Sequence, residues 1–405
     1  MSSVIILTST PLHAATVPDL VYYDRQQLEA IQDDIDAGHE QYVKALEQVS
    51  AKADKVLKLT IDSVVNKPNA GPSGDKHDYV SLAPYWWPNP ETEDGLPWIR
   101  KDGQLNPKTR GVYTDQKRAE TFLRGLGSLW LAYTYTSKDQ YADHMKVLLD
   151  AWLINDQTRM NPNLNFAQGI PGINDGRPFG IIEWSKVSHI VSAMQLLKAN
   201  NKIDSDFASK VDQWLSQYLN WLLTSELGQQ ESSKANNHGT WYDYQVIGLM
   251  TYLGKEQEAK AHLNISQQRI AEQIAGDGAQ PHELGRTKSI NYASMNAEGL
   301  IKIAFMAEQL GVDLWRFKGE QGQSLSAAVG YFYPYLTGAQ QWPHRQIWRT
   351  IDKAFVAKTH PMLYVAQAFM PSLNLPASIE AQVDQTISAE YRLLYRPKHV
   401  TGAYD

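Results

Sequence analysis

The stretch Ala235-Asn-Asn-His-Gly-Thr-Trp-Tyr-Asp-Tyr244 combines two amides, one imidazole and three aromatic rings. A helix-compatible segment ends before it, near Leu227, and the apolar run 246–253 after it predicts the next helix. The stretch is therefore predicted to be a polar turn that leads into a helix. A plain connecting loop would not need this chemistry.

Helical patterns extend outward from this turn in both directions. Apolar residues recur at three- or four-residue spacing in segments 24–59, 122–133, 145–152, 181–197, 207–223, 243–253, 257–275, 292–310, 322–336, 351–370 and 377–394. Alternation typical of strands is almost absent, so the sequence predicts an all-α fold.

The arrangement of these helices follows from the loops between them. Helical hairpins in a chain of this size either stack into a solenoid or close into a toroid. No repeat of solenoid period is present, and the unusual residues lie in long loops, as expected if these loops gather at one mouth of a toroid. We predict an incomplete (α/α) toroid of six or seven hairpins. No linker marks a second domain, so residues 21–400 are predicted to form one domain.

Composition restricts the possible functions. The 405 residues are 43% hydrophobic and carry a net charge of −6, which argues against nucleic acid as the main partner. A local basic cleft for an anionic substrate remains compatible with that charge. The absence of cysteine excludes disulfides, thiolate metal sites and a cysteine nucleophile. The 12 Trp and 21 Tyr residues favour a carbohydrate site, because sugar C–H faces stack on aromatic rings.

Residues 1–20 resemble a secretory signal or a disordered segment. A short apolar stretch is followed by Leu12-His-Ala-Ala15, which resembles a cleavage site near Ala14 and Ala15, although the positively charged start is missing. We expect a periplasmic or secreted protein rather than a cytoplasmic one. No segment reaches the roughly 18 apolar residues of a membrane span.

Residues 66–106 form the most unusual loop. They are rich in Pro, Gly and Asp and contain Tyr85, Trp86 and Trp87. A long segment without helical period inside a compact domain is typical of a functional loop or lid. The alternative is a surface excursion whose rings pack into the core. A second loop, 161–177, is rich in Asn, Pro and Gly.

Two further polar clusters indicate the chemistry. Asn237 and His238 lie in the central turn, and Arg286 and Tyr292 lie six positions apart at a predicted turn-to-helix junction. Such residues suit proton abstraction next to a carboxylate without metal or cofactor. Asn and Arg neutralise the carboxylate, whereas His and Tyr transfer protons. The neighbouring arginine would favour tyrosinate. The product would be a 4,5-unsaturated uronic acid, and the enzyme a polysaccharide lyase.

Other reaction classes fit less well. Acyl transfer would need a Gly-x-Ser-x-Gly elbow, which is absent. Glycoside hydrolysis needs two carboxylates across the scissile bond. Glu183, Glu226 and Glu283 are available for that role, but none has an obvious partner.

The motifs resemble a known family. Asn236-Asn237-His238 followed by Arg286-Thr-Lys-Ser-Ile-Asn-Tyr292 resembles, in order and spacing, the site of the alginate lyase superfamily of helical-toroid polysaccharide lyases, as in polysaccharide lyase family 5. The aromatic segments 77–90 and 95–103 are similar to polysaccharide lyase family 38, which includes alginate and glucuronan lyases. The resemblance spans about residues 60–310.

This resemblance implies metal- and cofactor-independent β-elimination on an anionic polysaccharide. Asn237 and Arg286 would neutralise the uronate carboxylate. Tyr292 would protonate the leaving O4, and would also take the C5 proton when that proton lies on the same side, as in mannuronate or glucuronate. His238 would help to neutralise the carboxylate, or would be the base when the proton lies on the opposite face, as in guluronate.

Further residues are candidates for substrate binding or for support of the site. The substrate-binding candidates are Tyr85, Trp86, Trp87, Arg177, Trp184, Trp241 and Tyr242. Each has a structural alternative, in which the ring packs in the core or the arginine serves a turn. His282 and Glu283 are predicted supporting residues, with Glu283 orienting Arg286, and His77 could cap the loop.

The expected substrate is alginate that contains mannuronate. Alternatives are glucuronan cleavage by the same mechanism, glycoside hydrolysis on the same fold, and a binding protein without turnover. The preferred uronate depends on subsite shape, which one sequence does not show, and neither endo or exo action nor oligomeric state follows from it.

Overall fold

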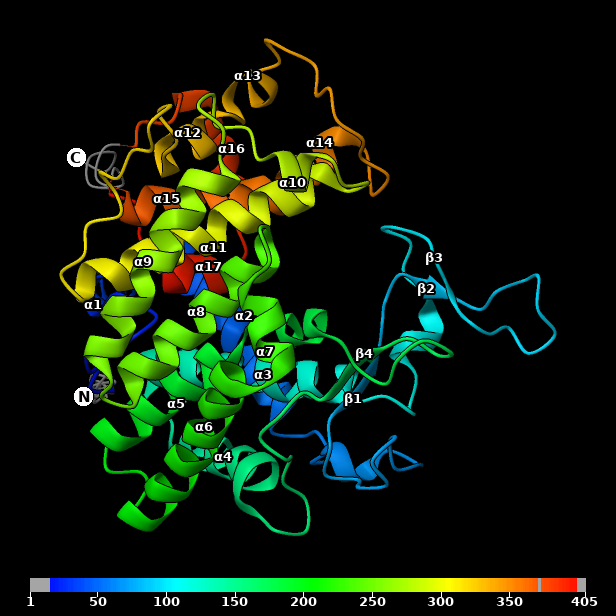
Figure 1. Cartoon of the computed structure of the whole chain (residues 1–405). Helices are drawn as coiled ribbons and strands as arrows, with labels where there is room; N and C mark the ends of the chain where they lie inside the picture. The colour runs from blue at the N-terminus through cyan, green and yellow to red at the C-terminus, as the bar shows by residue number, and fades with distance from the viewer. Residues whose placement is uncertain (1–14, 371–372, 399–405) are drawn as a thin grey trace, which may run out of the picture.

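The computed structural model describes residues 15–370 and 373–398, which are mainly helical (Figure 1). The predicted all-α class is confirmed. The α-helices are α1 (Arg25–Asp36), α2 (Glu40–Val56), α3 (Gln116–Thr136), α4 (Asp139–Leu149), α5 (Val187–Ala199), α6 (Ser205–Thr224), α7 (Glu226–Ser232), α8 (Asn237–Tyr252), α9 (Glu256–Gln273), α10 (Pro281–Leu284), α11 (Ser289–Gln309), α12 (Leu325–Gly330), α13 (Tyr333–Leu336), α14 (Ile351–Ala354), α15 (His360–Phe369), α16 (Ala377–Thr386) and α17 (Ala389–Leu394). Shorter helical turns are η1 (Val64–Asn66), η2 (Pro107–Arg110), η3 (Asp150–Ile154), η4 (Pro178–Trp184) and η5 (Phe355–Thr359).

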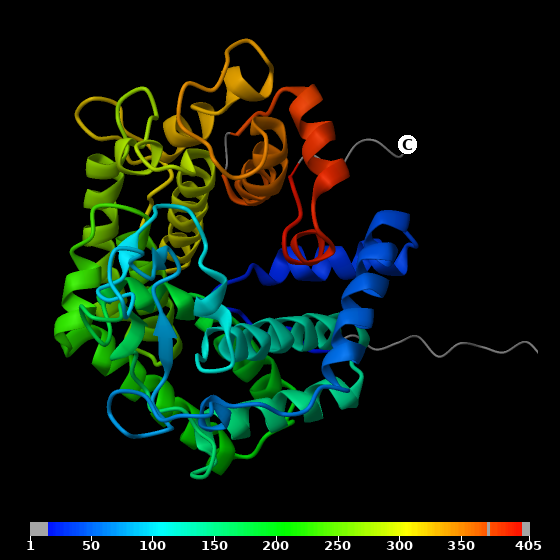
Figure 2. The ribbon, with the colours of Figure 1, turned by 90° about the vertical axis from the view of Figure 1, so that its right-hand side faces the viewer.

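The helices are arranged in a ring (Figure 2). α3, α5, α8, α11 and α15 each pack on the next, and α4, α6, α9 and α16 each pack on one or two of these five. α8 and α11 are buried on almost every side, because they have neighbours all around. α17 packs on α2 and α3, which brings the end of the chain against its start.

Two predicted boundaries were wrong. α8 begins at Asn237 rather than near 243, because the Asn236 side chain accepts a hydrogen bond from the His238 N–H and caps the helix. Such a cap lets a helix start on polar residues that show no apolar period. The predicted segment 24–59 is two helices, separated at Gly38, whose φ is +79°.

The loop 66–106 contains short strands that its composition did not predict. β2 (Trp86–Trp87) pairs with β3 (Ile99–Arg100) in an antiparallel hairpin, which projects beyond the helices on one side of the ring (Figure 1). β1 (Val80–Leu82) pairs in parallel with β4 (Phe166–Gly169). The two long loops are therefore joined to each other at this mouth of the ring.

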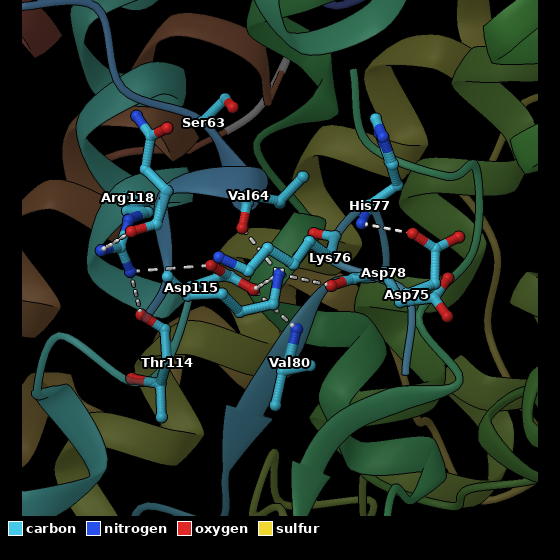
Figure 3. Close-up of polar contacts among 12 residues, drawn as sticks. Ser63, Val64, Asp75, Lys76, His77, Asp78, Val80, Thr114, Asp115 and Arg118 are labelled. Atoms are coloured by element: carbon cyan, nitrogen blue, oxygen red, sulfur yellow. Dashed lines mark hydrogen bonds and ion pairs between the residues drawn. The ribbon is translucent and has the colours of Figure 1, made fainter. Parts of the chain in front are cut away.

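A buried ion pair fixes the base of the loop. The Lys67 ammonium lies 2.9 Å from the Asp115 carboxylate, and both side chains are at most 1% exposed. Lys67 also donates to three backbone carbonyls, those of Val64, Lys76 and Asp78. Figure 3 shows Asp115 between Val64, Val80 and Arg118. Burial raises the pKa of Asp115 to about 6, although Lys67 opposes that shift.

The first described residues are packed against the helices. Ala15 is buried and its N–H donates to the carbonyl of Thr134, and the next N–H, of Thr16, donates to the Asn200 side chain. Ala14 and the apolar start of the predicted signal lie outside the described residues. Within residues 15–370 and 373–398, no helix is long and apolar enough to cross a membrane.

Candidate active site

The first turn of α8 presents Asn237 and His238 at the mouth of the ring. Asn237 is buried, and its backbone N–H and side-chain amide donate to the two Glu283 oxygens at 2.6 and 2.8 Å. This pair of bonds fixes the amide plane of Asn237. Glu283 thus supports Asn237 directly, and its charge also acts on Arg286, so its predicted role in orienting Arg286 stays a prediction.

His238 is held by a second carboxylate. Its Nδ1 lies 2.6 Å from an oxygen of Glu231, whose side chain is completely buried at the end of α7. The Phe179 ring contacts the imidazole, with centroids 4.6 Å apart and planes at 86°. With Nδ1 bound to a carboxylate, the neutral imidazole carries its proton there and leaves Nε2 as a proton acceptor.

Arg286 and Tyr292 form the other half of the site. The Arg286 guanidinium donates 3.1 Å to the Tyr292 hydroxyl and lies 4.1 Å from the centre of the same ring. It also donates to Asp102 from the long loop, at 2.9 and 3.4 Å. Burial alone would raise the pKa of Asp102, but bonds from Arg286 and Thr287 outweigh it and hold the pKa well below its usual range.

The close approach of the loop depends on a glycine. Gly103 has φ +72°, and a Cβ on it would lie 2.4 Å from the Thr287 Oγ1 and 3.0 Å from Ile347. Only glycine combines this backbone conformation with so close a contact. The loop is therefore shaped to place Asp102 on the turn that carries Arg286.

Tyr292 is protonated at rest. Its hydroxyl donates to the Tyr85 hydroxyl at 3.0 Å. Burial raises the pKa of Tyr292 well above its ordinary value, Tyr85 adds to the shift, and Arg286 only partly opposes it. Arg286 does favour tyrosinate, as expected, but burial, which the sequence does not show, outweighs its effect on the pKa.

Glu283 connects the two halves. It binds Asn237 directly, it immediately precedes the Arg286 turn, and its charge interacts with His238 and Arg286. Burial raises the pKa of Glu283, while its bonds from Asn237 oppose that shift. The four predicted catalytic residues are thus part of one connected polar cluster.

Basic side chains surround this cluster. Arg177 donates to the carbonyl and side-chain oxygens of Gln168 and lies 4.9 Å from the Phe179 ring centre. Burial and the nearby Arg100 lower its pKa to about 10. The Lys234 ammonium lies 5.2 Å from the centre of the Phe179 ring, which also contacts His238. Lys288 lies 5.1 Å from the Tyr85 ring centre. The positive charge of these side chains favours binding of an anionic ligand at the mouth of the ring.

The remaining aromatic candidates divide into two groups. Tyr85, Trp86 and Trp87 are half-buried on the loop. The Trp87 indole donates to the Gln104 carbonyl and lies 5.3 Å from the Lys101 ammonium. Trp241 is half-buried one turn beyond His238, edge-on to Tyr244. These residues keep partly accessible rings, and their sugar contacts stay predictions.

Trp184 and Tyr242 are not available to a substrate. Trp184 is 0% exposed, with Trp152 and Trp214 among its ring neighbours. Tyr242 is 3% exposed, and its hydroxyl donates to the Leu222 carbonyl inside the protein. Their predicted substrate contacts were wrong, because both rings fill the core between helices.

Two predicted histidine roles also change. His282 is exposed, and within the described residues it makes no hydrogen bond to the site, so its predicted supporting role was wrong. His77 binds the Arg159 carbonyl through Nδ1 at 2.6 Å and ties the base of the loop to the next one. In the described part of the chain, no three His, Asp or Glu side chains are grouped so that they could hold a metal.

Sequence analysis missed several contributors to the site: Asp102, Glu231, Phe179, Lys234, Lys288 and Gln168. Glu231 lies seven positions before His238. Two short helices that meet between these positions could bring the two side chains together, so the spacing could have indicated this contact. Gln168 has φ +52°, which is uncommon for a residue other than glycine, and only the structure shows it.

Comparison with known proteins identifies the relationship. The sequence matches the alginate lyase family over residues 63–342, more than half of the chain. The chain belongs to the alginate lyase family. A crystal structure of an alginate lyase from Bacteroides ovatus has 32% sequence identity and a TM-score of 0.86, and the match covers 94% of this chain and 100% of that one. The predicted enzyme class, polysaccharide lyase, is confirmed.

More distant members of the alginate lyase family share the fold. Alginate lyase A1-III from Sphingomonas species A1 matches with 18% identity and a TM-score of 0.53, over 86% of this chain and 95% of that one. A variant of that enzyme in complex with a tetrasaccharide gives a TM-score of 0.55. The predicted (α/α) toroid is confirmed. A comparison with curated protein sequences gave no match.

Proposed function

We propose that this lyase cleaves alginate by β-elimination and leaves 4,5-unsaturated uronate ends. The observation that carries the proposal is the hydroxyl of Tyr292, held between Arg286 and Tyr85 beside the Asn237–His238 pair. We assign the chain to the branch that resembles polysaccharide lyase family 38, with the Asn-His, Arg and Tyr site of family 5. We place it in the periplasm or outside the cell.

The first chemical requirement is to neutralise the uronate carboxylate. The C5 proton becomes acidic only when negative charge that develops on the carboxylate is stabilised. Asn237 offers an amide N–H beyond the one bound to Glu283, and Arg286 offers guanidinium N–H groups beyond those bound to Asp102. Both donors are fixed before substrate binds, but Asn237 is only 1% exposed, so substrate must displace the groups that cover it to reach its free N–H.

The second requirement is an acid for the leaving O4. Tyr292 is neutral at rest and can give its proton to O4, while the Arg286 contact stabilises the tyrosinate that forms. For guluronate, whose C5 proton lies opposite O4, Nε2 of His238 takes the proton. For mannuronate, Tyr292 acts as tyrosinate: its hydroxyl proton is first released to solvent, the tyrosinate then takes the C5 proton, and it gives that same proton to the leaving O4.

The proposal is tested by the unsaturated product. The wild-type protein, mixed separately with polymannuronate, polyguluronate and glucuronan, should raise the absorbance of the unsaturated uronate with at least one alginate block. Tyr292→Phe should abolish this rise and keep polymer binding. Tyr113→Phe, at an exposed tyrosine of the same chain, is the matched control and should keep full activity.

Four results would contradict the proposal. The absence of any product with all polymers would exclude a polyuronate lyase. Saturated products would indicate hydrolysis, and cleavage of glucuronan alone would assign a different substrate to the same mechanism. Full activity of Tyr292→Phe would exclude its role as the acid.

A further inference from the structure

A segment of the chain beyond the proposed catalytic residues runs directly beside them. The Ser289 N–H donates to the Arg345 carbonyl, and the Ile347 N–H donates to the Thr287 carbonyl. The Trp342 indole donates to the Ser289 hydroxyl at 2.9 Å. Residues 342–348 are thereby fixed to the turn between Arg286 and α11, so the residues that follow them have a defined position relative to the site.

Trp348, Arg349 and Lys358 form a compact group at the end of this segment. The Arg349 guanidinium lies 4.3 Å from the Trp348 ring centre, and the Lys358 ammonium lies 5.5 Å from it. Arg349 has φ +63°, a conformation that costs energy for a residue of its size. Strained residues of this kind gather at ligand sites, where the surrounding structure holds them in place.

The cations of this group have few anions near them. Burial lowers the pKa of the Lys358 ammonium, and Glu298 opposes this lowering. The charges of three neighbouring cations lower the pKa of Lys358 further; these cations are Arg349, Arg124 and Lys288. Within the described residues, no carboxylate lies within ion-pair distance of Lys288, Arg349 or Lys358.

The Glu298 carboxylate, which acts on Lys358, is already occupied. Glu298 pairs with Lys302 at 2.6 Å and accepts a hydrogen bond from the Tyr391 hydroxyl at 2.7 Å. Like charges held together without a counter-ion repel one another, so this arrangement is unfavourable in the free protein. A bound anion would remove that cost.

The group is accessible to solvent. The Lys358 side chain is exposed to solvent, yet the surrounding protein removes enough water to lower its pKa. The Trp348 ring is half-buried. A ligand can therefore reach both the ring and the two cations.

We propose that Trp348, Arg349 and Lys358 form a distal subsite for an acidic sugar, beyond the two units that flank the cleaved bond. The ring contacts the apolar face of the sugar, and the two cations bind its carboxylate. Lys288, between this subsite and Tyr85, faces the intervening unit. This inference rests on the proposed function, because it assigns a polyuronate as the ligand.

The test compares long and short substrates. Arg349→Asn/Lys358→Gln removes both charges, and asparagine tolerates the positive φ at position 349. Loss of charge-assisted contacts should raise KM for long polyuronate by about tenfold or more, with little change in kcat. KM for the shortest oligosaccharide that is cleaved should not change. Trp348→Leu should likewise raise KM for long polyuronate, with little change in kcat and no change in KM for the shortest oligosaccharide that is cleaved.

A matched control and a second measurement separate the possible outcomes. Lys353→Gln lies in the same segment, is exposed, and should leave every constant unchanged. Thermal unfolding of each variant shows that the fold is kept. If the wild type cleaves polyuronate and the double variant keeps its KM for long polymer, the distal subsite is excluded and the proposed function stands.

Failure of the proposed function gives a different result. If the wild type cleaves no polyuronate, that function is excluded, and calorimetric binding of polymannuronate then tests the subsite alone. Weaker binding by Arg349→Asn/Lys358→Gln than by Lys353→Gln would support the subsite, and equal binding would overturn it.

Discussion

Asp102 and Arg286, 184 positions apart in the chain, are joined by a 2.9 Å hydrogen bond from the guanidinium to the carboxylate. Asp102 also accepts bonds from the backbone and the hydroxyl of Thr287. A flexible arginine is thus held in one orientation by a residue of the long loop. The position of Arg286 depends on the loop as much as on the turn that carries it.

We predict that Asp102→Asn lowers kcat/KM on alginate by about ten- to hundredfold, the size expected when a charge-assisted contact is lost. The measurement is the initial rate of unsaturated product formation. Glu93→Gln, in the same loop and exposed, should have no effect. A faster Asp102→Asn enzyme would show instead that Asp102 competes with substrate for Arg286.

Glu231→Gln should impair His238 as a base. A buried glutamine cannot stabilise the imidazolium that forms when Nε2 takes a proton, so we expect a loss of about 100-fold on polyguluronate. The loss on polymannuronate should be smaller, because Tyr292 is the proposed base there. Glu226→Gln, exposed on the same helix, is the control. Equal losses on both polymers would contradict the division of roles.

The pKa of Tyr292 predicts the alkaline side of the pH profile. A general acid must be protonated, and a raised pKa keeps Tyr292 protonated beyond the ordinary tyrosine value of about 10. At pH values below 10, the rate on polyguluronate should therefore not decrease through loss of this proton. Tyr85→Phe removes one contribution to the shift, so the alkaline fall should move to lower pH. An unchanged profile in that variant would contradict the coupling of the two hydroxyls.

Lys67→Met should destabilise the protein by about 3–5 kcal/mol, because it leaves the buried Asp115 carboxylate without its partner. Urea unfolding measures the change. Lys76→Met, at an exposed side chain nearby, should change stability by no more than about 0.5 kcal/mol. Equal stabilities would show that solvent reaches Asp115.

Tyr242→Phe should separate a core residue from a subsite residue. Loss of the hydrogen bond to the Leu222 carbonyl should cost about 0.5–1.5 kcal/mol of stability. KM should not change, because the ring is buried. A raised KM with unchanged stability would restore the original prediction of substrate contact.

The sequence was sufficient for the parts of the site that depend on local order. Asn237, His238, Arg286 and Tyr292 lie in the first turns of two helices or just before them, and polar residues next to apolar periods indicated these positions. The helical class followed from the same periods.

The remainder depended on packing between distant segments. Nothing near Trp184 distinguishes it from Trp241, yet one fills the core and the other is half-exposed, because neighbouring helices decide which face of a ring is covered. Asp102 belongs to the site only through a long-range contact. The sequence showed the effect of Arg286 on Tyr292 but not the direction of the net pKa shift, because burial, which dominates that pKa, is a property of the fold.

The loop 66–106 is held by Lys67 at its base, by the pairing of β1 with β4, and by Asp102 on the turn of Arg286. It therefore spans the mouth as a bridge between the α3 side and the α11 side of the ring. Loss of the Asp102 contact should therefore free the Arg286 end of the loop, while the Lys67 pair and the β1–β4 pairing keep its base in place.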